Sequence, residues 1–224
     1  MLELKKELEK IKDSFARISE IVYQTPILSS ISINKALNAD IIFKAECLQE
    51  TGSFKLRGAS SAISVLSEDE KSRGVVAFSS GNHAQGIAYA AKELGTSAKI
   101  VMPYDAPKIK IRKTKEYGAE IIFYDREKDD REEIGSRIAL EERRKLIKPF
   151  DDLNVIYGQG TAALEVINEI NTKFDLSVVC CSGGGLAAGT GIVLKNSFRD
   201  CQLYTAEPKD WNDHEKSFTQ DKII

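Results

Sequence analysis

The chain has 224 residues, of which 42% are hydrophobic and 29% charged, a composition typical of a globular protein with a sizeable core. Its 32 Lys and Arg residues face 34 Asp and Glu residues, and this balance argues against a nucleic-acid partner. The charged N-terminus and the glycines that interrupt the longest uncharged run argue against a signal peptide or a membrane span, so we expect a cytoplasmic protein. Four cysteines without paired C-x-x-C spacing indicate neither a zinc site nor a disulfide framework, and Cys180 and Cys181 are predicted to be buried.

The first predicted element is an amphipathic helix near the N-terminus. Its apolar positions recur at steps of four and three residues, namely at Leu4, Leu8, Ile11, Phe15 and Ile18. Because the pattern stops before Tyr23, a helix packed on the main body is favoured over a coiled-coil seam.

Beyond Pro26, short apolar runs alternate with helical patterns. Strands are expected at residues 41–45, 75–78, 98–102, 120–124, 177–181 and 202–206. Helices are expected near residues 55–66, 83–94, 108–117, 130–145, 161–171 and 186–195. This rhythm predicts an α/β fold with parallel sheets covered by helices. A smaller domain at residues 74–146 is expected to be inserted in a larger, discontinuous one formed by residues 1–70 and 150–224.

Three segments rich in Gly, Ser, Thr and Asn precede predicted helices, at residues 51–55, 79–83 and 182–186. Helix N-termini carry unpaired N–H groups and a partial positive charge, and glycine lets these donors approach an anion closely. Three such segments, two of them after predicted strands, indicate a crevice at the carboxyl ends of a sheet.

The first of these segments contains a candidate nucleophile, Lys55. Ser53 is a candidate N-cap, which places Lys55 in the first helical turn between apolar Phe54 and Leu56. Both the positive helix end and an apolar setting favour the neutral amine, the form that reacts with aldehydes. The alternative is an ordinary solvated lysine on a helix face.

Residues 44–59 resemble the cofactor-lysine segment of the serine/threonine dehydratases and serine racemases, which are fold type II pyridoxal phosphate (PLP) enzymes. The resemblance spans most of residues 25–213 in matching order. Its further segments are residues 79–86, 102–103, 106–110, 117–120, 158–161, 182–186 and 206–208. It implies a fold of two parallel-type α/β domains, a small amino-acid substrate and a homodimer. Relatives in this family continue beyond the position of Ile224.

The resemblance also implies residue roles. Lys55 would hold PLP covalently and move protons at the substrate Cα, with Phe54 beside the cofactor and Asn82 bonded to its ring hydroxyl. The phosphate would be wrapped by backbone N–H groups of Gly183, Gly184, Gly185 and Leu186. The substrate carboxylate would be held by Ser79, Asn82 and His83. Ser80 matches the acid/base serine on the opposite ring face in the racemases, whereas its alternative role is to cap a helix. For His83, positioning is favoured over proton transfer.

A divalent-cation site is implied further along the chain. Glu207, the Trp211 carbonyl and Asp213 match positions that bind a metal in metal-activated racemases and related dehydratases, and such oxygen ligands suit Mg²⁺ or Ca²⁺. The alternative is a solvated acidic loop.

The resemblance favours a PLP-dependent ammonia-lyase acting on a small β-hydroxy amino acid, with a racemase as the first alternative. A second alternative is a dinucleotide-binding oxidoreductase, because residues 183–188 fit G-x-G-x-x-A and Glu207 follows the next strand. That assignment leaves Lys55 and Asn82 without a role. A third alternative is a truncated family member without activity.

Overall fold

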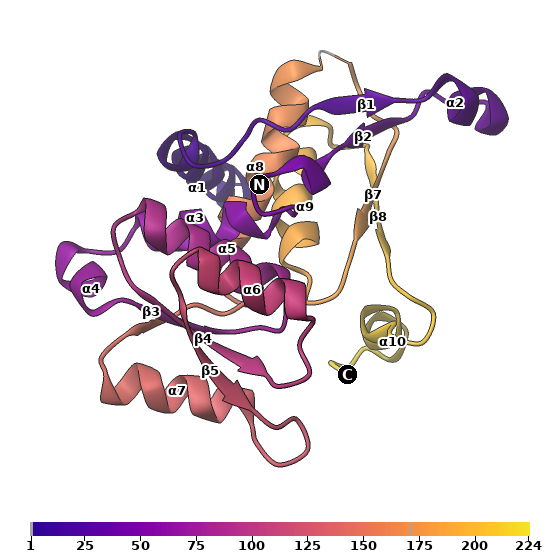
Figure 1. Cartoon of the computed structure of the whole chain (residues 1–224). Coiled ribbons are helices and arrows are strands. Elements are labelled where there is room, and N and C mark those ends of the chain that lie inside the picture. Colours follow the sequence, from indigo (N-terminus) through magenta and orange to yellow (C-terminus); the bar gives the residue numbers. More distant parts are fainter. Residues whose placement is uncertain (1, 171) are drawn as a thin grey trace.

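The computed structural model describes residues 2–170 and 172–224 and is an α/β arrangement of several sheets and surrounding helices (Figure 1). The N-terminal part consists of α1 (Leu2–Ile18), β1 (Ile27–Ser29), α2 (Ile31–Leu37), β2 (Ile42–Lys44), the 3-10 turn η1 (Glu46–Leu48), α3 (Lys55–Ser64) and α4 (Glu68–Arg73). The middle part consists of β3 (Val75–Phe78), α5 (Asn82–Glu93), β4 (Ala98–Pro103), α6 (Lys108–Glu116), β5 (Glu120–Tyr124), α7 (Arg131–Glu141) and β6 (Lys145–Leu146). The last part consists of α8 (Leu153–Glu169), β7 (Leu176–Cys180), α9 (Gly185–Ser197), β8 (Gln202–Ala206) and α10 (Asp213–Gln220).

The central sheet has the strand order β5-β4-β3-β6, and all its neighbouring pairs are parallel. Successive residues of β3 point to opposite faces, as the two-residue period of a strand requires. Val75 and Ala77 pack with α3 and α5, whereas Val76 and Phe78 pack against α7. The prediction of a parallel sheet covered on both faces is therefore confirmed, and all four strands lie within residues 74–146.

The helices α1, α3, α8 and α5 form a layer whose core is continuous with the sheet. Ile18, Leu56, Ile63 and Val155 belong to the same buried cluster as β3 and β4. The crossing of α3 and α8 is close enough to require glycine, because a Cβ on Gly158 would lie 2.4 Å from the Arg57 carbonyl oxygen. This close contact fixes the start of α3, and therefore Lys55, relative to α8.

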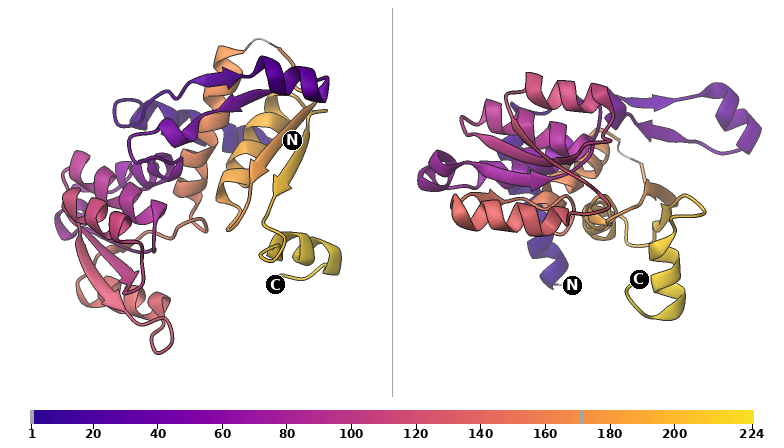
Figure 2. Two further views of the ribbon diagram at one scale, coloured as in Figure 1. Left: turned by 45° about the vertical axis from the view of Figure 1, so that its right-hand side comes forward. Right: turned by 60° about the horizontal axis from the view of Figure 1, so that its bottom comes forward.

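Two further strand pairs flank this body. Strands β7 and β8 are parallel and are joined through α9, whereas β1 and β2 are antiparallel and project with α2 as an arm (Figure 2). The antiparallel pair was not expected from the sequence. Exposed apolar side chains lie on both pairs, among them Leu28, Phe43, Val178 and Tyr204.

Most predicted elements are confirmed, with two clear errors of extent. The helix expected near residues 130–145 ends at Glu141, and Lys145 belongs to strand β6. Helix α8 begins at Leu153, eight residues before the predicted start at residue 161, because Asp152 accepts hydrogen bonds from the Asn154 and Val155 N–H groups and caps it. The N-terminal helix packs on α8 and α9 as expected. None of the described helices combines the length and apolarity needed to cross a bilayer.

Candidate active site

All three glycine- and serine-rich segments lead directly into helices, as predicted. Helix α3 begins at Lys55, α5 at Asn82 and α9 at Gly185. None of these three N-termini has a side-chain cap in the described chain, and neither do those of α6 and α10, whereas α2, α4, α7 and α8 are capped by Ser30, Ser67, Asp130 and Asp152. The N–H groups that ordinary helices give to caps are thus left available to anions.

The segment at residues 147–150 connects the three helix starts. Lys55 Nζ donates a 2.7 Å hydrogen bond to the Pro149 carbonyl oxygen, and His83 Nε2 lies 3.3 Å from the Ile147 carbonyl oxygen. The Phe150 ring packs against the glycine loop, since a Cβ on Gly183 would lie 2.1 Å from it. Lys55, His83 and the glycine loop are therefore parts of one site.

The Lys55 ammonium group lies in a setting that favours its neutral form. Burial lowers the pKa of Lys55 from 10.5 to about 8, while the nearby Cys180 thiol acts in the opposite direction. The Phe54 ring lies beside the amine, with its centroid 5.3 Å from Nζ. Helix α5 approaches from another side, because a Cβ on Gly86 would lie 3.0 Å from the Lys55 carbonyl oxygen. Lys55 is thus a held, partly desolvated amine rather than a solvated surface lysine.

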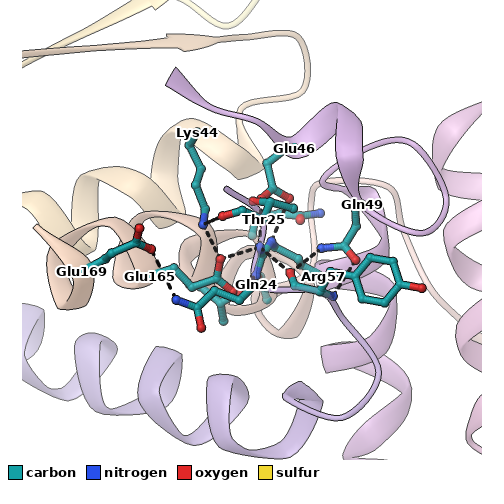
Figure 3. A network of polar contacts seen from close by, with 12 residues as sticks. Gln24, Thr25, Lys44, Glu46, Gln49, Arg57, Glu165 and Glu169 are labelled. Carbon is teal, nitrogen blue, oxygen red and sulfur yellow. Dashed lines mark hydrogen bonds and ion pairs between the residues drawn. The ribbon is translucent and has the colours of Figure 1, made fainter. Parts of the chain in front are cut away.

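A buried ion network anchors the first turn of α3 (Figure 3). Arg57, with 0% of its side chain exposed, donates to both Glu46 carboxylate oxygens at 2.8 Å. It also donates to both Glu165 carboxylate oxygens, at 2.6 and 2.8 Å, and Lys44 Nζ completes the network 2.5 Å from Glu165. Two cations thus balance two carboxylates, which is the condition for keeping such charges away from water. The network ties η1, β2 and α8 to the helix that begins with Lys55.

His83 is neutral in this structure. Burial is the main cause that lowers its pKa to about 3, and the Lys55 charge lowers it further, although the Ile147 carbonyl opposes this. Because Nε2 donates to that carbonyl, Nδ1 is an acceptor, and it has no donor among the described residues. The buried hydroxyl groups of Thr51 and Ser53 are likewise without partners in the described chain.

These observations also correct two expectations about capping and burial. Ser53 is not the N-cap of α3, because the cap position is Phe54 and the Ser53 hydroxyl makes no capping bond. Of the two adjacent cysteines, Cys181 is buried as predicted, whereas Cys180 is exposed because one face of β7 is uncovered. The exposed Cys180 lies at the end of the strand that leads into the glycine loop.

The loop before α5 carries the predicted substrate residues and follows β3 of the central sheet, whereas the glycine loop follows β7 of a separate two-stranded sheet. The prediction that these segments lie at the carboxyl ends of one sheet is therefore wrong. The Ser79 hydroxyl accepts a 3.1 Å bond from the Gly81 N–H, and Ser79 and Ser80 are half-buried. Ser80 does not cap α5, since the cap position is Gly81. Asn82 is exposed at the start of α5, and its Oδ1 accepts a 2.5 Å bond from Lys110 Nζ.

The loop at residues 182–186 has the backbone needed to wrap an anion. Gly184 has φ +82°, in the left-handed region that favours glycine, and Gly185 and Leu186 form the first turn of α9. His214 of α10 holds this loop through a contact between its Nε2 and the Ser182 carbonyl oxygen. Sequence reasoning missed both His214 and the segment at residues 147–150.

The residues predicted to bind a metal lie near α10. Both Glu207 carboxylate oxygens accept bonds from backbone N–H groups of α10, at 3.2 Å from His214 and 2.9 Å from Glu215. Trp211 and Asp213 are exposed, and within residues 2–170 and 172–224 no group of three or more His, Cys, Asp and Glu side chains is placed to hold a metal. Glu207 in this structure stabilises the start of α10, and the cation site stays a prediction.

The donor set fits PLP. The Lys55 amine, whose pKa is lowered by burial, can react with the aldehyde of PLP. The uncapped starts of α5 and α9 offer N–H groups for two anions, the substrate carboxylate and the cofactor phosphate. The central expectation from the sequence was that Lys55 lies near the glycine loop. Lys55 is half-buried, its Nζ bonds the Pro149 carbonyl oxygen, and the adjacent Phe150 packs against Gly183, while the cofactor role of Lys55 stays a prediction.

Two curated proteins of known name match nearly the whole chain. The chain is 43% identical over 216 residues to a serine racemase of Schizosaccharomyces pombe, covering 96% of this chain and 67% of that protein. It is 45% identical over 214 residues to an L-threo-3-hydroxyaspartate ammonia-lyase of Saccharomyces cerevisiae, covering 96% and 65%. The chain thus spans about two thirds of the length of these curated relatives.

Solved structures confirm the fold type II prediction. Maize serine racemase superposes with a TM-score of 0.93 at 39% identity, covering 96% of this chain and 65% of that one. The processed form of threonine deaminase isoform 2 from Solanum lycopersicum has a TM-score of 0.93 at 31% identity, covering 99% and 64%. The family model described as "Pyridoxal-phosphate dependent enzyme" matches residues 18–224, and the oxidoreductase alternative is thereby dropped. The chain belongs to the family of pyridoxal-phosphate dependent enzymes, whose members related to it include both lyases and racemases.

Proposed function

We propose that this chain carries the active site of an ammonia-lyase that removes the β-hydroxyl and the amino group from a small β-hydroxy amino acid. The observation that supports it most strongly is the placement of the Lys55 amine, which is joined through residues 149 and 150 to the glycine loop. When bound, PLP supplies an electron sink that makes the substrate Cα proton acidic. The residues of the chain then have four separate tasks.

Lys55 Nζ holds the cofactor and takes the Cα proton, for which its lowered pKa suits it near neutral pH. The N–H groups of residues 183–186 bind the phosphate, and Phe150 closes one side of their loop. The start of α5 binds the substrate carboxylate through Ser79, Asn82 and the N–H of His83. Because the His83 imidazole is neutral and buried, its task is to position the loop rather than to transfer protons.

The three candidate substrates, serine, threonine and 3-hydroxyaspartate, differ only in their side chains. A relative named as a 3-hydroxyaspartate ammonia-lyase and a structural neighbour named as a threonine deaminase both support a β-hydroxy amino acid. The alternative function is racemisation, which is favoured by the half-buried Ser80 on the loop before α5 and by the relatives named as serine racemases. In that case Lys55 would keep the proton taken from one face of Cα, and the Ser80 hydroxyl would donate its own proton to the opposite face.

The test is a product assay on the PLP-loaded 224-residue chain with L-serine, L-threonine and L-threo-3-hydroxyaspartate. Release of ammonia with formation of a keto acid supports the lyase, and Lys55→Ala is expected to abolish it. Inversion of Cα without ammonia release, lost in Ser80→Ala, supports the racemase instead. Binding of PLP at Lys55 without either product supports the third alternative, a family member whose chain is not active by itself.

The cation site, the homodimer and the cytoplasmic location are also proposals. A Mg²⁺ or Ca²⁺ site at Glu207, the Trp211 carbonyl and Asp213 requires Glu207 to exchange its bonds to α10 for the cation. Calorimetry with either cation tests it, with Asp213→Asn expected to weaken binding at least tenfold. The homodimer and the cytoplasmic location stay predictions.

A further inference from the structure

Asn82 does not stand alone at the start of α5, because a charged side chain from a neighbouring helix holds it. Lys110 Nζ donates a 2.5 Å hydrogen bond to Asn82 Oδ1. Lys110 lies in the first turn of α6, and its neighbour Ile111 packs on the main core. Helices α5 and α6 are also joined by the edge-to-face contact of Tyr89 and Tyr117, whose centroids are 5.2 Å apart. The lysine is therefore presented from a packed element.

This contact determines which end of the Asn82 amide is free. An asparagine side chain has one acceptor oxygen and two N–H donors, and rotation by 180° exchanges them with little change in shape. A lysine ammonium group has three donors and no acceptor, so it pairs with the oxygen only. With Oδ1 held by Lys110, the two Nδ2 donors remain for another group. Such a group must accept hydrogen bonds, as an ionised hydroxyl or a carboxylate does.

We infer that Lys110 is a positioning residue of this site, which fixes the Asn82 amide with its donors toward bound anions. The inference rests on the proposed function, because it needs the cofactor hydroxyl or the substrate carboxylate to lie at Asn82. No covalent step is assigned to Lys110.

The experiment uses the 224-residue chain and two measurements on bound PLP that do not depend on turnover. The first is the dissociation constant for PLP, and the second is the pH midpoint of the visible absorption band of lysine-bound PLP. For Lys110→Met we expect an approximately tenfold weaker affinity and a midpoint raised by at least half a pH unit, because an Asn82 amide that is no longer held with its donors toward the cofactor stabilises the deprotonated cofactor less. Lys110→Arg is expected to restore both values to within a factor of two and 0.2 pH unit of the wild type.

Two controls separate this role from a structural or general charge effect. Lys108→Met removes an exposed lysine from the same helical turn and is expected to leave both measurements unchanged. In an Asn82→Ala background, Lys110→Met is expected to change the affinity less than twofold, since the amide on which it acts is gone. Unfolding midpoints of the PLP-free variants show whether folding is intact, and Lys110→Gln provides a second variant if Lys110→Met folds poorly.

The inference is overturned if Lys110→Met binds PLP and titrates like the wild type, or if its tenfold loss persists in Asn82→Ala. These outcomes differ from failure of the proposed function. If the proposed function fails, the wild type shows no visible absorption band that depends on Lys55. If only the inference about Lys110 fails, the wild-type band is present and the effect of Lys110→Met is missing.

Discussion

Replacing Lys55 by methionine is expected to stabilise the PLP-free chain at neutral pH while abolishing cofactor attachment. Methionine has nearly the volume and length of lysine without its charge, so the substitution removes the burial of the ammonium group and little else. The pKa of Lys55 falls from 10.5 to about 8 through that burial. At about 1.4 kcal/mol per pH unit, this shift corresponds to roughly 3 kcal/mol of destabilisation of the folded chain below pH 8.

The sign follows from proton binding. Between pH 8 and 10.5 the unfolded chain holds a proton on Lys55 that the folded chain has lost, so the stability of the wild type rises with pH across this window. Below pH 8 the penalty is fully present. The substitution also removes the hydrogen bond to the Pro149 carbonyl, worth about 1 kcal/mol, which leaves a net gain of about 2 kcal/mol at pH 7. For a chain of this size that gain is about 4–8 °C in Tm.

The assay is urea unfolding of wild type, Lys55→Met and the exposed control Lys108→Met at several pH values from 7 to 10.5. The difference between wild type and Lys55→Met is expected to shrink steadily above pH 8, whereas the control shows no such trend. A Lys55→Met chain that is less stable than wild type at pH 7, or a difference independent of pH, would refute the description of Lys55 as a buried, easily deprotonated amine.

Three further predictions concern the groups around Lys55. Since the pKa of His83 is lowered to about 3, stability is expected to fall by about 3 kcal/mol more in the wild type than in His83→Leu between pH 7 and 4.5, as measured by urea unfolding at both pH values. Gly183→Ala forces a Cβ against the Phe150 ring and is expected to destabilise the chain by about 1–3 kcal/mol and to weaken PLP binding. A double-mutant cycle should show that the destabilisation largely disappears in Phe150→Ala, and equal penalties in both backgrounds would contradict the contact. Arg57→Met leaves two carboxylates buried and is expected to cost about 3–5 kcal/mol, whereas a loss below 1 kcal/mol in thermal unfolding would show that the network is not a buried anchor.

The sequence predicted the helix starts at the site because each has a local chemical signature. The segments ending at Lys55, His83 and Leu186 combine glycine or serine with a following apolar helical pattern, and the structure starts helices there. The rule that parallel strands present their carboxyl ends at one edge did not predict their arrangement, because β3 and β7 belong to different sheets and Lys55 follows η1.

The parts that sequence reasoning missed depend on contacts distant in the chain. Nothing in residues 147–150 indicates that their carbonyl groups bind Lys55 and His83, which are more than 60 positions away. The burial of Arg57 likewise depends on Glu165, 108 positions away, and a lone arginine on a helix gives no local sign of it. Strands β1 and β6 have three and two residues, too few for a two-residue period to be visible. The start of α8 did have a signal, namely Asp152, which the glycines inside the helix obscured.

The most direct test of the central claim is site-specific capture of PLP by borohydride reduction, followed by peptide mass mapping, at pH values from 6 to 9. With a pKa of about 8, roughly 9% of Lys55 is neutral at pH 7, about 300 times the neutral fraction of an ordinary lysine. Labelling at limiting PLP is expected to be concentrated on Lys55, to rise through a midpoint near pH 8 and to level off by about pH 9. Labelling spread over surface lysines, or a Lys55 yield that is still rising steeply at pH 9, would contradict it.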